Sequence, residues 1–467
     1  MEQNNPMPLK LNMKRTFIIG FAFFGILLLW QVYDLWCPPL LTEMFKNVLS
    51  ARRGGAVVDD TEVQYLVGII MALDNLAALI LMPIFGRLSD KTHTKLGKRM
   101  PYILFGTGCA IILMNILPFI DNSYYTQPSS FKMISFVVVL GLLLIAMGTY
   151  RSPAVALMPD VTPKPLRSKA NAIINLMGAV GGIIYLGIAA VLYPNSKTVG
   201  VAHVNYQILF VVVSAIMFVA VGLLFLIIKE KDLVLENRLL ESEHPEWNLA
   251  EEDGSGHEQL PSEVKRSLGF LLASIALWFI GYNGVTTWFT AYVANVMGQG
   301  LGGASTCLLV ATAGAIVSYI PIGNIASKIG RRKTIMGGIV LLSLMFALGF
   351  VLTNIFKTIN LIMYISFALV GLAWAAINVN SLPMVVEMCK GSDIGKFTGY
   401  YYTASMAAQI VTPILAGTLM RLISYKILFI YSAFFVLLSF VTMTQVRHGD
   451  QKVEAKKGLE AYEAMDD

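Results

Sequence analysis

Twelve stretches of about 20 mostly apolar residues recur along this chain of 467 residues, separated by polar or charged segments. At 1.5 Å per residue, an α-helix of that length matches the thickness of the hydrocarbon core of a lipid bilayer. Composition agrees, because only 14% of the residues are charged, whereas soluble domains carry roughly 25%. The sequence therefore predicts an all-α membrane protein with twelve transmembrane helices.

Charged clusters, prolines and glycines set the expected limits of these helices. The first six are expected at 16–38, 63–86, 101–120, 132–158, 170–193 and 205–228. The second six are expected at 267–294, 302–326, 334–354, 359–386, 397–420 and 426–446. The first run ends at two prolines without a small-residue cleavage site, so we interpret it as a retained helix and not as a signal peptide.

A long polar segment divides the chain into two parts. Residues 229–266 are too charged to enter a bilayer and in part too glycine-rich to pack firmly, so they are predicted to be a cytoplasmic linker. The linker separates a six-helix bundle at 1–228 from a second at 267–446, and 447–467 form a tail. Most of the 35 lysines and arginines lie in alternate loops, which places both termini in the cytoplasm of a cell whose plasma or inner membrane holds the protein.

A short motif occurs at the same place in both predicted bundles. After the second helix the chain reads Gly86-Arg-Leu-Ser-Asp90, followed by the basic pair Lys98-Arg99, and a related glycine and basic run occupies 321–333 after the eighth helix. Glycine permits close helix approach, and the basic residues can hold the loop at an anionic membrane surface. The motif resembles the signature of the major facilitator superfamily. That resemblance implies two six-helix bundles that alternate access to a central site. It also implies that Gly86, Asp90, Lys98 and Arg99 form a gate that clasps the bundles on the inner side.

Within that superfamily the N-terminal half resembles the glycoside-pentoside-hexuronide:cation symporters and the sucrose-type proton symporters. The likeness rests on 83–86, on the start of the third helix at 98–103, and on Arg151-Ser-Pro153 with the segment 157–162 in and after the fourth. It implies symport of a sugar, such as a glycoside or disaccharide, without an organic cofactor. Melibiose-type members carry acids where this chain has Ala78, Met82 and Arg151, so the resemblance favours proton coupling over sodium coupling.

Three charged residues fall inside apolar runs. A charge near the bilayer centre costs about 2.5–3.5 kcal/mol on insertion scales, so Asp34, Asp74 and Arg151 are candidates for function. Packing of the first, second and fourth helices would bring both acids toward the arginine. Either acid is then a candidate for proton or cation coupling, and a static ion pair that orders the bundle is the alternative.

Polar and aromatic side chains at helical spacing mark further candidates. Amides, hydroxyls and aromatic planes suit a sugar, and hydrogen bonds between helices are the alternative for each one. The candidate substrate-binding residues are Gln31, Arg151, Asn175, Tyr282, Asn283, Trp374, Asn378 and Gln409. Asp160 and Glu387, at the cytoplasmic ends of the fourth and tenth helices, are further candidates for the gate, with interfacial solvation as the alternative.

Other classes of protein fit the chain less well. A Walker phosphate loop is absent, which argues against an ATP-driven pump, and the histidines lack the paired spacing of a metal site. An enzyme is not expected, because the apolar runs hold no catalytic constellation. The expected partners are a small polar solute and the lipid bilayer, not nucleic acid, and a monomer is expected although the sequence leaves the oligomeric state open. An exporter of drugs or metabolites, an amphiphile carrier and a membrane sensor remain as alternatives.

Overall fold

The structure is a computed structural model of the chain and describes residues 10–244, 261–388 and 394–450. Within these ranges twelve helices are long and apolar enough to cross a membrane, which confirms the predicted number. The first half holds α1 (Met13–Arg52), α2 (Gln64–Lys91), α3 (Met100–Thr126), α4 (Ser130–Asp160), α5 (Arg167–Leu192) and α7 (Gln207–Ile227). The second half holds α10 (Ser262–Met297), α11 (Leu301–Ile329), α12 (Arg331–Ile355), α13 (Leu361–Val386), α14 (Ile394–Leu422) and α15 (Ile427–Thr444).

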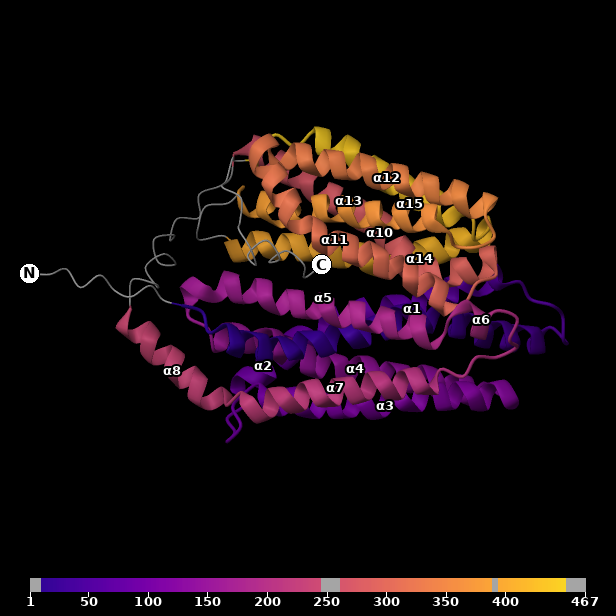
Figure 1. Cartoon of the computed structure of the whole chain (residues 1–467), viewed down its shortest axis with the longest axis horizontal. Coiled ribbons are helices and arrows are strands. Elements are labelled where there is room, and N and C mark those ends of the chain that lie inside the picture. Colours follow the sequence, from indigo (N-terminus) through magenta and orange to yellow (C-terminus); the bar gives the residue numbers. More distant parts are fainter. Residues whose placement is uncertain (1–9, 245–260, 389–393, 451–467) are drawn as a thin grey trace, which may run out of the picture.

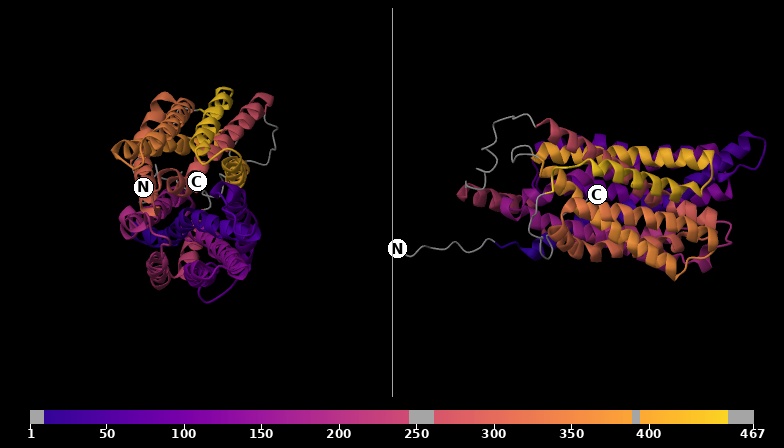
Figure 2. Two further views of the ribbon diagram at one scale, coloured as in Figure 1. Left: turned by 90° about the vertical axis from the view of Figure 1, so that its right-hand side faces the viewer. Right: turned by 90° about the horizontal axis from the view of Figure 1, so that it is seen from above.

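These helices form two bundles of six, one from each half of the chain (Figures 1 and 2). In the N-terminal bundle α1 packs along α5 and α3 along α4, and in the C-terminal bundle α11 packs along α13 and α10 along α15. The bundles meet through α2 with α14, α5 with α11 and α1 with α10. The predicted two-bundle architecture is therefore confirmed.

Four short helices mark the two ends of the molecule. At one end, called the α6 end, lie η1 (Asp60–Val63) and α6 (Asn195–Thr198). At the other, called the α8 end, lie η2 (Lys164–Leu166) and α8 (Glu230–Glu243). Figure 1 shows the two bundles approaching each other toward the α6 end and diverging toward the α8 end.

Close backbone contact joins the bundles at the α6 end. Gly68 of α2 lies so near the carbonyl group of Pro413 on α14 that a larger side chain would not fit there. One turn earlier, the side-chain amide of Gln64 donates a hydrogen bond to the hydroxyl of Tyr425. Small residues at such a crossing allow the two helices to pack backbone against backbone.

The second joint at the α6 end pairs α6 with the start of α11. The amide nitrogen of Asn195 donates to the side-chain oxygen of Gln299 at 2.7 Å. Toward the α8 end, by contrast, α2 loses such cover, because Leu79, three turns after Gly68 on the same face of the helix, is 48% exposed. The bundles are thus tied at one end and apart at the other.

The structure corrects the predicted end of the first helix. We expected it to end at residue 38, yet α1 runs through Pro38 and Pro39 to Arg52. The two prolines lack the N–H groups that would bond the carbonyls one turn back, which normally kinks or ends a helix. Here Leu41 and Met44 beyond them are 0% and 1% exposed, so tertiary packing maintains the helix.

The polar linker also differs from its prediction as a segment that does not pack. Its first part forms α8, which is fixed to the N-terminal bundle by Arg15 on Glu236 at 3.1 Å and by Arg167 on Glu241 at 3.0 Å. The amide of Asn237, which is 4% exposed, donates to the main-chain carbonyl of the last residue of α4. Residues 245–260 of the linker lie outside the described residues.

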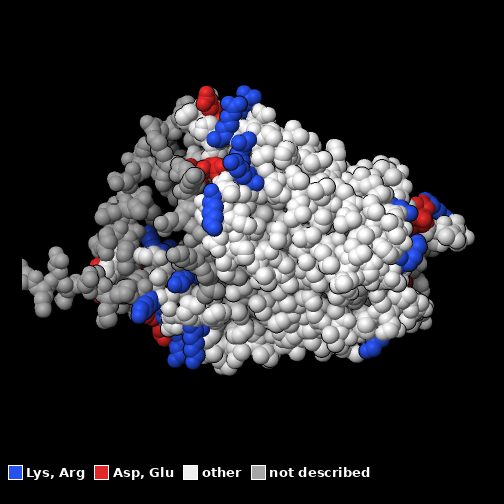
Figure 3. Space-filling model, turned by 45° about the horizontal axis from the view of Figure 1, so that its top comes forward, with Lys and Arg blue, Asp and Glu red and all other residues white. Residues whose placement is uncertain are grey.

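On the face shown in Figure 3, charged side chains lie at the two ends of the molecule. Figure 3 shows a broad belt without charged side chains between a group of Lys and Arg at the α8 end and a smaller charged group at the opposite end. Such a belt is what a multi-pass protein presents to lipid tails.

Candidate functional site

The centre of the N-terminal bundle holds an acid, an arginine and a tryptophan. Asp74 of α2 is 6% exposed and accepts a hydrogen bond from the indole of Trp30 on α1. The guanidinium carbon of Arg151 on α4 lies 3.8 Å from the centre of the Trp30 ring, a cation–π distance. Arg151 also interacts electrostatically with Asp74. Three helices thus bring Asp74 and Arg151 together across one aromatic ring, and the sequence did not point to Trp30.

Further polar groups of α1, α2 and α4 lie close to Asp74 and Arg151. The hydroxyl of Tyr33 lies 3.1 Å from the carbonyl oxygen of Ile70 and 3.3 Å from that of Met71, one turn before Asp74 on α2. On α4, Pro153 has no N–H group to donate to the carbonyl one turn earlier in the helix. That carbonyl group belongs to a residue two positions before Arg151. Side chain and backbone therefore both make this level of the bundle polar.

Asp34 lies one turn from Trp30 on α1 and is partly buried. It interacts electrostatically with Asp74, with Cys37 and with the phenol of Tyr185 on α5. The structure thus places both predicted acids near each other. Of the two, it joins Asp74 more directly to Arg151.

The C-terminal bundle contributes an aromatic surface. The rings of Tyr282 on α10 and Trp374 on α13 are stacked, with centres 3.7 Å apart and planes 4° from parallel, and Phe279 meets the same tryptophan edge-on. Trp374 is 5% exposed. Stacking fixes the orientation of both predicted residues, which is useful for binding the apolar face of a ring.

Asn378 has a structural use. Its side-chain oxygen accepts from the hydroxyl of Tyr401 on α14 at 3.4 Å, and its amide nitrogen lies 3.5 Å from the hydroxyl of Tyr319 on α11. Ser381 joins the same group through Tyr401 at 3.2 Å. These long hydrogen bonds link three helices, so the helix-to-helix alternative describes Asn378 in this structure.

The other candidates for substrate binding lie on four different helices. Gln31 of α1 faces Gly182 of α5, and Asn175 of α5 is 3% exposed. Asn283 of α10 and Gln409 of α14 are partly buried. The amide nitrogen of Asn283 has no hydrogen-bond partner among the described residues, which leaves a buried donor at the level of Tyr282.

The predicted gate residues of the N-terminal bundle form one ion-pair network at the α8 end. Arg99 binds Asp160 of α4 at 2.8 Å and Asp90 of α2 at 2.5 Å, and also contacts the carbonyl of Gly86 at 3.4 Å. Lys98 binds Asp160 at 3.1 Å. All these contacts lie within the N-terminal bundle, so the expectation of a clasp between bundles is not met in this structure, in which the bundles are apart at the α8 end.

The sequence did not identify Glu230, which completes this network. Its carboxylate, 1% exposed at the start of α8, accepts from the backbone N–H groups of Lys98, Arg99 and Met100 at 2.8, 2.9 and 2.8 Å. These are the free donors of the first turn of α3, where a negative charge is favoured. The preceding Gly97 has φ +110°, a conformation that glycine adopts readily.

The C-terminal bundle repeats the arrangement with fewer contacts. Glu387 at the end of α13 pairs with Arg331 at the start of α12, as Asp160 pairs with Arg99. The backbone N–H groups of Arg331 and Arg332 donate to the carboxylate of Asp450 at 2.6 and 3.3 Å. The predicted repeat therefore extends to an acid after the last helix of each bundle.

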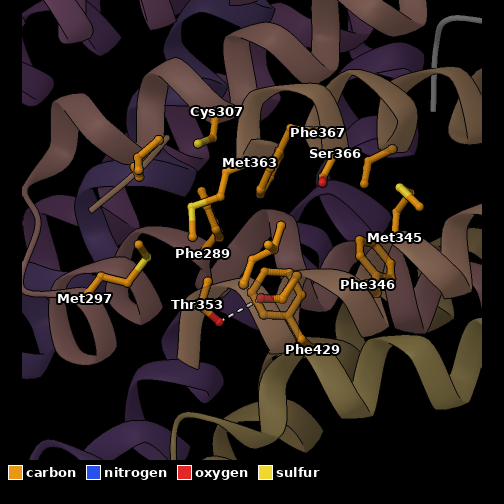
Figure 4. A pocket seen from close by; sticks show the side chains of 14 residues that line it. Phe289, Met297, Cys307, Met345, Phe346, Thr353, Met363, Ser366, Phe367 and Phe429 are labelled. Atoms are coloured by element: carbon orange, nitrogen blue, oxygen red, sulfur yellow. Dashed lines mark hydrogen bonds between the residues drawn. The ribbon is translucent and has the colours of Figure 1, made fainter. Parts of the chain in front are cut away.

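A small pocket inside the C-terminal bundle is a poor solute site. Figure 4 shows it lined mainly by phenylalanine and methionine side chains, with the thiol of Cys307 and the hydroxyl of Ser366 among them. The cavity volume of this pocket is about 10 Å³, which leaves room for roughly one water molecule.

Comparison with known proteins finds partial relatives. Sucrose transport protein SUT3 of Oryza sativa subsp. indica is 33% identical over 138 residues, which are 27% of this chain and 26% of that protein. Sucrose transport protein SUC3 of Arabidopsis thaliana is 31% identical over 121 residues, 23% of this chain and 20% of that protein. The MFS-type transporter ppzB of Metarhizium rileyi is 28% identical over 116 residues, 25% and 23% of the two chains. The match thus spans about a quarter of each relative.

Solved structures share the fold over almost the whole chain. A bacterial homologue of the iron transporter ferroportin, in an inward-facing state, gives a TM-score of 0.65 at 10% identity and covers 94% of this chain and 99% of its own. The xylose transporter XylE from E. coli, in a partially occluded inward-open conformation, gives 0.63 at 12% identity, with 92% and 98% covered.

A family model described as Major Facilitator Superfamily matches residues 16–320 and 301–461. These matches together span almost the entire chain, and they agree with the two six-helix bundles and with the signature at 86–99. The chain therefore belongs to the major facilitator superfamily and is a membrane transporter of that family.

Proposed function

We propose that the chain is a proton-coupled sugar symporter that works by alternating access. The observation that carries this proposal is Asp74, a carboxylate buried in the middle of the N-terminal bundle beside Arg151 and Trp30. Ionisable residues within membrane spans are rare and mark functional sites, proton relays among them. The sucrose transport proteins among the relatives support the sugar class.

Proton binding and sugar binding are coupled through the arginine. When Asp74 is charged, it attracts the guanidinium of Arg151. Protonation removes that attraction and leaves the planar fork of Arg151 available to sugar hydroxyls, which it can bind through two N–H groups at once. Release of the proton restores the attraction and weakens the hold on the sugar. Asp34, close enough to Asp74 to sense its charge, is a second carrier in the same path.

The opposite bundle supplies the second wall of the sugar site. The stacked pair of Tyr282 and Trp374 offers a fixed aromatic plane, and the buried amide of Asn283 offers a donor without a partner among the described residues. Pyranose rings combine an apolar face with hydroxyl edges, so a plane and a few donors and acceptors suffice to orient one. Gln31, Asn175 and Gln409 are the remaining candidates for that role.

The arrangement of the bundles corresponds to one step of the cycle. With both termini in the cytoplasm, the α8 end faces the cytoplasm, and the joint of Gly68 with Pro413 closes the outer side. In the outward-open step this joint opens, and the network around Arg99 meets the other bundle. The proposal thus assigns the inward-facing state to this structure.

Proton movement tests the proposal directly. Purified protein is placed in liposomes that contain a pH-sensitive dye, and a panel of mono- and disaccharides is added outside without any ion gradient. Internal acidification with one sugar and not with its epimers is the expected result. No acidification across the panel, with no uptake of labelled sugar under proton or sodium gradients, would reject sugar symport in favour of an exporter or amphiphile carrier.

The Asp74→Asn substitution separates coupling from binding. It keeps the shape of the side chain and removes the titratable group, so uphill accumulation of the sugar should be lost while exchange of labelled for unlabelled sugar persists. The matched control is Asp232→Asn on α8, an exposed acid outside the bundle core, which should leave both activities unchanged. Uphill uptake that survives in Asp74→Asn would remove this residue from the coupling role.

A further inference from the structure

A second cavity lies at the joint of the bundles, at the α6 end. The cavity volume is about 280 Å³, which is enough for a small organic molecule. The N-terminal bundle contributes Trp36 and Glu43 of α1, Asp121 of α3 and the segment 201–206, and the C-terminal bundle contributes Thr290 of α10 and the start of α11. The cavity therefore touches both moving parts of the transporter, and its lining residues on α1, Trp36 and Glu43, lie about 9 and 20 Å along the helix from Trp30.

Several residues of the walls carry a buried polar atom that has no hydrogen bond among the described residues. Asp121 is 4% exposed and Thr290 is 4% exposed, and an oxygen of each lacks a hydrogen bond among the described residues. The indole nitrogen of Trp36, 1% exposed, is in the same position. The three residues, from three helices and both bundles, line one cavity. Buried polar atoms normally have partners, so an unpartnered set around a cavity points to a ligand.

The charge of the cavity selects the kind of ligand. Asp121 interacts electrostatically with Glu43, so two acids share the space. The histidine that faces them, His203, lies 3.6 Å from Asp121, but burial lowers the pKa of His203, which keeps the ring neutral at pH 7. Lys46 interacts electrostatically with Glu43, which is exposed, and also forms an ion pair with Asp60. Lys46 is thus shared between Glu43 and Asp60, and negative charge is in excess beside the buried Asp121, where an uncompensated charge is costly.

From this arrangement we propose that the cavity binds a small protonated amine that carries hydroxyl groups. The ammonium group donates to Asp121 and Glu43, and the hydroxyls accept from the indole of Trp36 and exchange hydrogen bonds with Thr290. An organic cation fits better than a bare metal ion, because no three His, Cys, Asp or Glu side chains in the described part of the chain are grouped to hold a metal. A ligand that spans both bundles here holds the α6 end closed.

Calorimetry with a matched pair of probes tests the site on the purified full chain in detergent and phosphate buffer at pH 7. Tris(hydroxymethyl)aminomethane, protonated at this pH, should bind, whereas 1,1,1-tris(hydroxymethyl)ethane, which has the same hydroxyls and no charge, should not. Equal binding of the two probes would overturn the proposal, and so would a stronger response to K⁺ or Ca²⁺ chloride than to the amine.

Variants locate the binding. Asp121→Asn should weaken amine binding by about ten- to a hundredfold, the range for loss of a charged hydrogen bond. Asp74→Asn is the control, because it neutralises the acid of the central site and should leave amine binding unchanged. If Asp121→Asn does not fold, Glu43→Gln and Thr290→Val carry the test, with monodispersity on size exclusion as the check. Loss of amine binding in Asp74→Asn alone would assign the amine to the central site and overturn the inference, whatever solute the protein transports.

Discussion

The carboxylate of Glu230 is predicted to stabilise the whole N-terminal bundle, and Glu230→Gln isolates its charge. The two oxygens accept from three successive backbone N–H groups at the start of α3, at 2.8–3.1 Å, with the side chain 1% exposed. Glutamine has the same shape, but one of its two terminal atoms is a nitrogen that donates. That nitrogen would face the N–H of Met100, so one buried donor would lose its acceptor.

The cost follows from two effects. A buried donor left without a partner costs about 1–3 kcal/mol, and loss of a negative charge at a helix N-terminus adds up to about 1–2 kcal/mol where the group is partly buried. We therefore expect a loss of about 3 kcal/mol. In a unit of 150–250 residues each kcal/mol lowers the melting temperature by about 2–4 °C, so the N-terminal bundle should melt roughly 6–12 °C lower.

Thermal unfolding of the purified protein in detergent measures the effect. The matched control is Glu236→Gln on the same helix, because Glu236 makes an ion pair with Arg15 while 54% exposed, and an exposed pair is worth about 0.2–1 kcal/mol. Glu230→Gln should therefore lower the melting temperature several times more than the control. Equal shifts in the two variants would refute the argument that the buried cap, rather than attachment of α8 in general, stabilises the bundle.

Two further substitutions test the central site and the outer joint. Trp30→Phe keeps a ring beside Arg151 but removes the N–H group that donates to Asp74, so proton-driven uptake should fall about ten- to a hundredfold. Trp30→Ala also removes the ring and should lower uptake further. Equal uptake in wild type and Trp30→Phe would contradict this prediction. Gly68→Val should force α2 away from α14 and open the α6 end. A single cysteine in place of Ala416, which is 1% exposed, should then react faster with a maleimide that does not cross membranes. An unchanged reaction rate would show that the contact of Gly68 with α14 does not keep the joint closed.

The sequence predicted the architecture well because the bilayer imposes a length on every helix. Runs of about 20 apolar residues gave the number of helices, and most limits lie within a few residues of the structure. The first helix is the exception, since Pro38 and Pro39 are local signals that burial of the next turns overrides. Local rules describe one segment at a time and do not see what packs against it.

The site was predictable in part. Asp34, Asp74 and Arg151 are visible because charge is rare in an apolar run, and the structure places them near one another. Trp30 gave no signal, since a tryptophan in an apolar run is equally at home against lipid. Glu230 gave none either, because its partners are backbone N–H groups 130–132 residues away in sequence. Their roles in coupling and in binding stay predictions until transport is measured.

The acid after the last helix of the C-terminal bundle allows the capping argument to be tested again under different burial. Asp450 accepts from the N–H groups of Arg331 and Arg332 at the start of α12, after Gly330 with φ +96°, as Glu230 does after Gly97. Unlike Glu230, however, Asp450 is exposed, so water can replace it. Asp450→Ala should therefore cost about 1 kcal/mol or less, clearly below Glu230→Gln, when both are melted in the same detergent. A larger loss of stability in Asp450→Ala would mean that burial does not determine the strength of these caps. It would also contradict the argument for the loss expected in Glu230→Gln.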